Sequence, residues 1–189
     1  MIQEATGDRR RALEDAFFAH DNGGSPHGAH AAVGHDMRPQ ALSAASGITD
    51  PALLARLVAA GIDGDTLTCL SLAPLVAVAW ADGALDAKER AALLTAAAES
   101  GIERQGPAFR LLEDWLAHPP PPQLIEAWSH YVRDRGAAME PGAVQALRLH
   151  LLGRARRVAE AAGELLGHAR PVSPAEEAML ERLERAFAT

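Results

Sequence analysis

The sequence predicts an all-α protein, and its composition and its apolar spacing both indicate this class. Apolar residues make up 48% of the 189 positions, while aromatic residues make up only 4%. Ala and Leu are abundant and strand-forming residues are scarce, which favours helices. Apolar side chains also recur at helical spacing between recognisable start and stop signals. A chain of this length buries roughly 70% of the surface that its unfolded form exposes, so a stable core needs no disulfide.

The expected organisation has three parts. Residues 1–22 should contain an amphipathic helix whose apolar face includes Leu13 and Phe17. Residues 23–46 are rich in His and Gly and lack a helical period, so we expect a flexible linker or surface loop there. The regular pattern begins after this stretch, and residues 47–189 are expected to form one compact helical domain.

Caps and breakers delimit the helices of this domain. Asp50 and Pro51 should begin a helix that Gly61 ends. The next segment is apolar on all sides as far as Trp80 and should lie in the centre of the bundle, capped by Asp65 or Thr66 and kinked or split at Pro74. Further helices are expected over residues 87–99, 107–118, 124–136 and 141–166, and from the capping box of Ser173 and Glu176 onward. The expected architecture is a compact bundle of about seven or eight helices.

Charge and motif content argue against several functional classes. The formal net charge of −7 disfavours a nucleic-acid partner, which would need a clustered positive field. The longest apolar stretch, residues 67–81, is too short for the roughly 20 residues of a membrane span. The N-terminus lacks a secretory signal pattern, so we expect a cytoplasmic protein without direct membrane insertion. Phosphate loops, nucleophile elbows and zinc-protease motifs are missing from the sequence, so we do not expect an enzyme.

One acidic turn carries the main functional hypothesis. Residues 81–89 read Ala-Asp-Gly-Ala-Leu-Asp-Ala-Lys-Glu, which places carboxylates at Asp82, Asp86 and Glu89. Three hard oxygen ligands around one tight turn suit Ca²⁺ or Mg²⁺. Asp86 and Glu89 are equally the N-cap and N3 residues of the following helix, whereas Asp82 has no capping role in this pattern. Cation binding and structural capping alone both fit the spacing.

This segment resembles the signature of TerB-like tellurite-resistance domains, in which Ala-Asp-Gly, a hydrophobic residue, an acidic residue, two spacers and Glu join two core helices. The resemblance covers roughly residues 65–102, and a fainter copy aligns residues 172–180 with residues 85–93. It implies a TerB-like helical fold, a divalent cation at the acidic turn and a stress-associated role in a bacterial cytoplasm with an unidentified protein partner. The alternative is a metal-free helical module for protein–protein interaction.

Two other groups of polar residues have simpler explanations. Half of the eight histidines fall in one short stretch, at His20, His27, His30 and His35. This composition can collect Zn²⁺ or Ni²⁺, but the spacing matches no closed structural site, and a solvated loop is favoured. The arginines of residues 148–157 could hold a phosphate or an acidic partner. We expect them instead to form a solvated helix face that Glu160 and Glu164 neutralise.

The remaining conspicuous side chains are expected in the core. Cys69 is the only cysteine and sits in an apolar run, so we interpret it as a buried, unreactive thiol. The three tryptophans fall on apolar stripes and should pack inside the bundle. Leu75 should lie at the centre of the same core, because the helix that carries it offers solvent no polar face.

Overall fold

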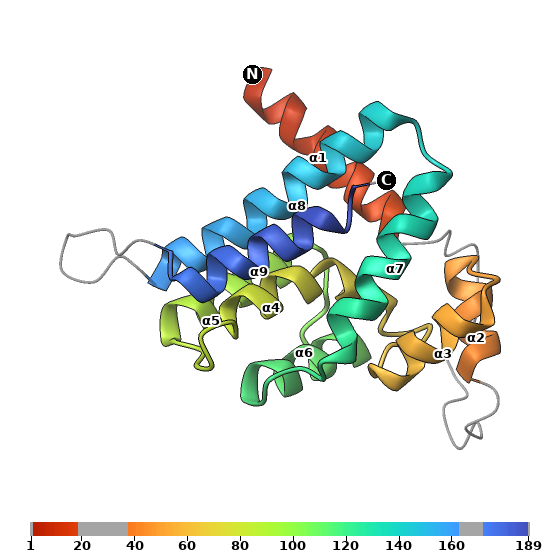
Figure 1. The fold of residues 1–189 in the computed structure, drawn as a ribbon, viewed down its shortest axis with the longest axis horizontal. Helices are drawn as coiled ribbons and strands as arrows, with labels where there is room; N and C mark the ends of the chain where they lie inside the picture. The colour runs from red at the N-terminus through yellow and green to blue at the C-terminus, as the bar shows by residue number, and fades with distance from the viewer. Residues whose placement is uncertain (1, 19–37, 163–171, 189) are drawn as a thin grey trace.

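The computed structural model describes residues 2–18, 38–162 and 172–188. Within these ranges the chain forms nine α-helices and one short 3₁₀ helix, and no strand, so the all-α prediction is confirmed. Helix α4 (Ala73–Ala79) lies in the middle of the molecule, against α8 (Pro141–Ala162) and α9 (Pro174–Arg185), while α5 (Ala87–Glu99) packs on α8 (Figure 1). None of the described helices is long and apolar enough to cross a membrane.

The expected N-terminal helix is present as α1 (Ile2–Phe18), and its last turns pack into the common core. Phe17 and Phe18 are both buried, and each ring contacts Tyr131 of α7 (Gln123–Ala137). The Tyr131 hydroxyl donates a hydrogen bond of 2.7 Å to the backbone oxygen of Phe17. The Phe17 carbonyl lies in the last turn of α1, where no N–H of the helix can reach it, and the Tyr131 hydroxyl supplies the missing donor.

Helix α2 (Arg38–Ser46) lies inside the stretch that the sequence analysis assigned to a linker over residues 23–46. That assignment is wrong for residues 38–46. Residues 19–37, with all four clustered histidines, lie outside the described residues, as do residues 163–166 of the helix expected to reach residue 166. The buried Leu42 packs α2 onto the core.

Helix α3 (Pro51–Ala59) begins as expected, with the Asp50 side chain accepting a bond of 2.9 Å from the Ala52 N–H. It also ends as expected, since Gly61 adopts a positive φ of 84° that other residues rarely take. The following turn differs from the prediction. Thr66 occupies the N-cap position of the 3₁₀ helix over residues 67–71, but its side chain caps no N–H of that helix. Its hydroxyl instead accepts the Asp63 N–H at 2.8 Å, and the Asp63 carboxylate accepts the N–H groups of Asp65 and Thr66, each at 3.0 Å.

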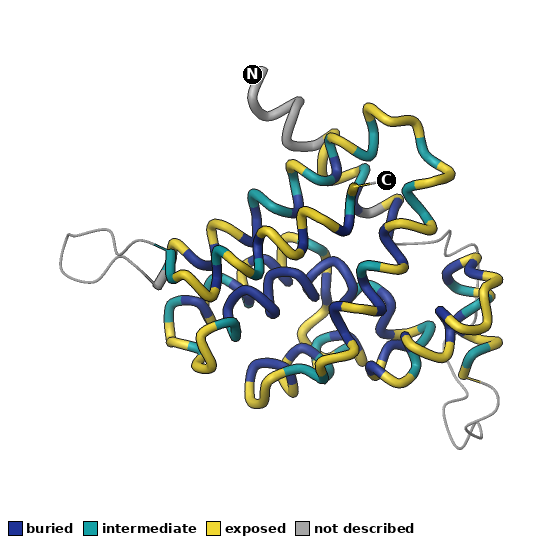
Figure 2. The backbone as a smooth tube through the Cα atoms, in the orientation of Figure 1, coloured by how far each residue is buried: buried dark blue, intermediate teal, exposed yellow. Residues whose placement is uncertain are grey.

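The apolar segment is split, as Pro74 predicted. A 3₁₀ helix, η2 (Leu67–Ser71), leads into α4, and Pro74 lies in the first turn of α4, where its missing N–H leaves no bond unmade. Every residue of α4 is buried, and Figure 2 shows this helix as a continuous buried tube at the centre. The central position expected for Leu75 is therefore confirmed.

The tryptophans lie where the apolar stripes placed them, with one qualification. Trp115 of α6 (Pro107–Ala117) and Trp128 of α7 are fully buried. Trp80 is only partly buried at the end of α4, where its indole N–H donates a bond of 2.8 Å to the backbone oxygen of Trp115. This bond joins α4 to α6 beside the acidic turn.

Candidate functional site

The acidic turn connects α4 to α5, and each of its three carboxylates accepts a backbone hydrogen bond. Asp86 is the N-cap of α5 and accepts the N–H groups of Lys88 at 2.7 Å and Glu89 at 2.8 Å. Glu89 accepts the N–H of Asp86 at 2.9 Å, which completes a capping box. Asp82 accepts the N–H of Ala84 at 3.1 Å. Asp82 caps no helix, as expected, but it stabilises the turn by accepting an N–H two residues ahead.

A second capping box lies nearby, at the start of α9. The Ser173 hydroxyl accepts the N–H of Glu176, and the Glu176 carboxylate accepts the N–H of Ser173 at 2.6 Å. This unit belongs to the fainter sequence copy, so both copies begin a helix in the same way. Glu89 is 4% exposed and Glu176 is 6% exposed. The two buried N3 glutamates lie close enough for the charge of Glu176 to raise the pKa of Glu89.

The neighbourhood is strongly unfavourable to negative charge. The pKa of Glu89 is raised from 4.5 to about 7, and burial is the largest cause. The bond from the Asp86 N–H lowers the pKa, and the carboxylates of Asp86, Glu176 and Asp82 each contribute to the rise. A proton or a cation at this junction would offset both the desolvation of the Glu89 carboxylate and its repulsion by the neighbouring carboxylates. Perturbed carboxyl groups of this kind mark candidate functional sites as well as structural networks.

The arrangement of the carboxylates does not yet amount to a coordination shell. Across residues 2–18, 38–162 and 172–188, no group of three or more His, Cys, Asp or Glu side chains is placed to hold a metal ion. Asp82, Asp86 and Glu89 belong to the same turn, but their described bonds go to the backbone. Capping by Asp86 and Glu89 is confirmed, and cation binding stays a prediction.

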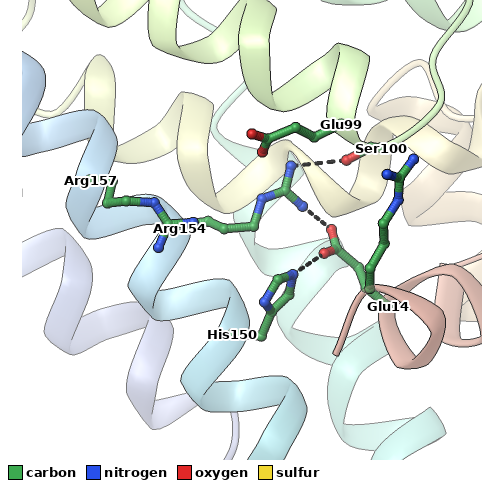
Figure 3. Close-up of a pocket in the computed structure, with 7 residues that line it drawn as sticks. Glu14, Glu99, Ser100, His150, Arg154 and Arg157 are labelled. Atoms are coloured by element: carbon green, nitrogen blue, oxygen red, sulfur yellow. Dashed lines mark hydrogen bonds and ion pairs between the residues drawn. The ribbon is translucent and has the colours of Figure 1, made fainter. Parts of the chain in front are cut away.

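A buried ion pair that the sequence analysis did not anticipate joins α1 to α8. Arg154 is 5% exposed and Glu14 is 4% exposed, and the Arg154 guanidinium donates to the Glu14 carboxylate. The second oxygen of Glu14 lies 2.6 Å from Nε2 of His150 (Figure 3). The expectation of a solvated arginine face is therefore wrong for Arg154. Charged side chains are buried only when they are paired and hydrogen-bonded, and this network meets that condition.

Arg154 also bonds the end of α5. Its Nη2 donates to the backbone oxygen of Ala96 and to the hydroxyl of Ser100, both at 2.9 Å. The Ala96 oxygen also accepts the Ser100 N–H at 3.0 Å, so the guanidinium adds a second donor to this carbonyl and opposes the negative end of the helix dipole. A single side chain thereby links α1, α5 and α8.

The other arginines of α8 remain closer to the solvent. Arg148 pairs with Glu184, and Arg156 pairs with Glu177 at 2.9 Å, so α9 supplies their partners. No described ion pair joins Glu160 to these arginines, and Glu164, the other acid expected to neutralise them, lies outside the described residues. Sequence periodicity could have distinguished Arg154 from these two, because it continues the spacing of the buried Leu147 and Leu151.

Cys69 is the buried core thiol that the sequence predicted. Its sulfur lies 2.9 Å from the backbone oxygen of Ala108, and burial raises the pKa of the thiol to about 12. The thiolate, which is the reactive form, is therefore strongly disfavoured.

Comparison of the chain with models of protein families, with characterised proteins and with solved structures produced no match. The resemblance to TerB-like domains therefore rests on the sequence alone, on residues 65–102 and the fainter copy at residues 172–180. The two capping boxes and the buried network around Glu14 and Arg154 are properties of this chain's own geometry.

Proposed function

We propose that the protein is a TerB-like, stress-associated helical domain of the bacterial cytoplasm that takes up a divalent cation, Ca²⁺ or Mg²⁺, where the acidic turn meets α9. The observation that supports this proposal is the accumulation of carboxylates around Glu89. Among the described residues, every charged group that shifts the pKa of Glu89 is itself a carboxylate. A bound cation would stabilise the ionised forms, at a place where burial and mutual repulsion destabilise them.

Coordination is compatible with the caps. The described backbone bonds of Asp82 and Asp86 all go to Oδ1. Coordination through Oδ2 would therefore leave the turn and the start of α5 intact. Glu89 and Glu176 would complete the shell by rotating their carboxylates, and each would then exchange a backbone bond for the ion.

The test is a thermal melt in CaCl₂ or MgCl₂ against NaCl at equal ionic strength. A ligand of the native state raises the melting temperature by mass action, so wild type should melt higher with the divalent ion. Asp82→Asn and Asp86→Asn should abolish that rise, while Asn keeps the backbone acceptor and the cap. Asp50→Asn is the matched control, because it makes the same change of charge at the N-cap of α3 and should keep the response.

The second candidate is a metal-free helical module for protein–protein interaction. It is favoured by the fact that all three carboxylates of the acidic turn already accept backbone bonds. No rise in melting temperature at millimolar Ca²⁺ or Mg²⁺ would contradict cation binding and favour this module. Neither candidate assigns the protein a catalytic activity.

A further inference from the structure

A cavity of about 270 Å³ lies where α1, the end of α5 and α8 meet. It is separate from the acidic turn, and the Glu14–Arg154 pair forms part of its wall (Figure 3). Its charged and polar lining consists of Arg11, Glu14, Glu99, Ser100, His150, Arg154 and Arg157. Each lining residue carries a polar or charged group that a ligand could contact, although carbon atoms make up most of the exposed lining.

The balance of charge around the cavity is positive. Three arginines line it against two glutamates, in a chain whose formal net charge is −7. Glu14 is engaged with Arg154 and His150, so it does not neutralise Arg157. Glu99 is the other acid, and the described part of the chain gives it no ion-pair partner. A locally positive cavity in an acidic protein attracts anions selectively.

Two arginines supply the donors. Arg154 donates three described bonds, through Nη1 to Glu14 and through Nη2 to Ala96 and Ser100. A guanidinium has five N–H groups, so its Nε–H and one Nη1–H have no acceptor among the described residues. Arg157 is exposed and has no ion-pair partner in the described ranges. Its Nη1 lies 3.8 Å from the position of a Cβ on Gly153, so the guanidinium lies back over the preceding turn of α8, and both arginines line the cavity.

We propose that this cavity binds a small molecule through an oxyanion group, phosphate or carboxylate, held between Arg154 and Arg157. Planar guanidinium groups match such oxygens with paired, charge-assisted hydrogen bonds. Arg154 is held in place by Glu14, Ala96 and Ser100, so binding does not have to order it. The volume of about 270 Å³ lies just below the roughly 300–1,000 Å³ typical of ligand pockets, which limits the ligand to a small metabolite.

The experiment titrates the full chain with inorganic phosphate and, separately, with acetate, at constant ionic strength set by chloride, and follows binding by NMR. Saturable shifts are expected at Ser100 and His150. Arg157→Gln should weaken binding about tenfold, as expected for the loss of a charged hydrogen bond. Glu99→Gln should tighten binding, because it removes the acid beside the site. The stronger of the two anions identifies the ligand group.

Arg156→Gln is the matched control. Arg156 is the adjacent residue on α8, is also exposed, and pairs with Glu177 of α9 instead of lining the cavity. Its replacement makes the same change of net charge and should leave binding unchanged. Equal weakening by both arginine variants would show a non-specific effect of charge and overturn the proposal. Shifts that do not saturate with either anion would overturn it too, without bearing on the acidic turn.

Discussion

Replacing Arg154 by methionine should destabilise the protein more than any change at an exposed arginine. The substitution keeps a long apolar stem but leaves the Glu14 carboxylate, 4% exposed, without its guanidinium. Removing one partner of a buried ion pair costs about 3–5 kcal/mol. For a chain of this size, each 1 kcal/mol lowers the melting temperature by about 2–4 °C, so Arg154→Met should melt about 6–20 °C lower.

Urea unfolding at pH 7 measures this loss, and two further variants test its cause. Arg156→Met removes an exposed ion pair and should cost less than about 1 kcal/mol. The double variant Glu14→Met with Arg154→Met removes both charges and should recover most of the loss, since a buried ion pair is often no more stable than apolar residues of similar volume. A cost below about 1 kcal/mol for Arg154→Met alone would refute the inference that this pair fastens α1 to α8.

Three further predictions concern the acidic turn and the core. The pKa of Glu89 is about 7 in the folded protein against an ordinary value of 4.5. Between pH 4.5 and about pH 7 the native state therefore holds a proton that the unfolded state has released, so the free energy of unfolding should fall as pH rises through this interval. In chelator, urea unfolding of Glu89→Gln should show a flatter pH dependence and about 1–3 kcal/mol more stability at pH 8 than wild type; an unchanged slope would contradict the assignment. Asp86→Ala should cost about 0.5–2 kcal/mol in thermal melts while Asp86→Asn stays close to wild type, and equal losses would argue against the cap. Leu75→Ala should cost about 2–5 kcal/mol in urea, and less than about 1 kcal/mol would be inconsistent with its central position.

Local chemistry explains what the sequence could predict. The N-caps at Asp50, Asp86 and Ser173 each bond an N–H within three residues, so the sequence contains both partners of the interaction. The split at Pro74 and the end of α3 at Gly61 likewise follow from the conformations those residues allow. These features were predicted correctly because they depend on covalent geometry and on near neighbours.

The errors arise where distant contacts decide the structure. Helix α2 has one large aliphatic residue, Leu42, and therefore a weak helical pattern, and packing against the core compensates for it. Glu14 and Arg154 are 140 residues apart, and a charged residue considered by itself is expected to be solvated. The position of each residue on an apolar stripe does indicate burial, but the sequence does not specify which acid pairs with which base. The proximity of Glu176 to Glu89 is a long-range property of the same kind.

The buried thiol of Cys69 gives this protein a built-in reporter of its own motions. The chain has no other cysteine, so a thiol reagent added to the folded protein has a single target. That target is fully buried, with its sulfur against the Ala108 carbonyl, and modification must wait for the core around η2 and α6 to open. Where reclosing is fast, the labelling rate measures the free energy of that opening under native conditions. Comparing this rate between wild type and Arg154→Met would show whether α1 can detach alone or only together with the core.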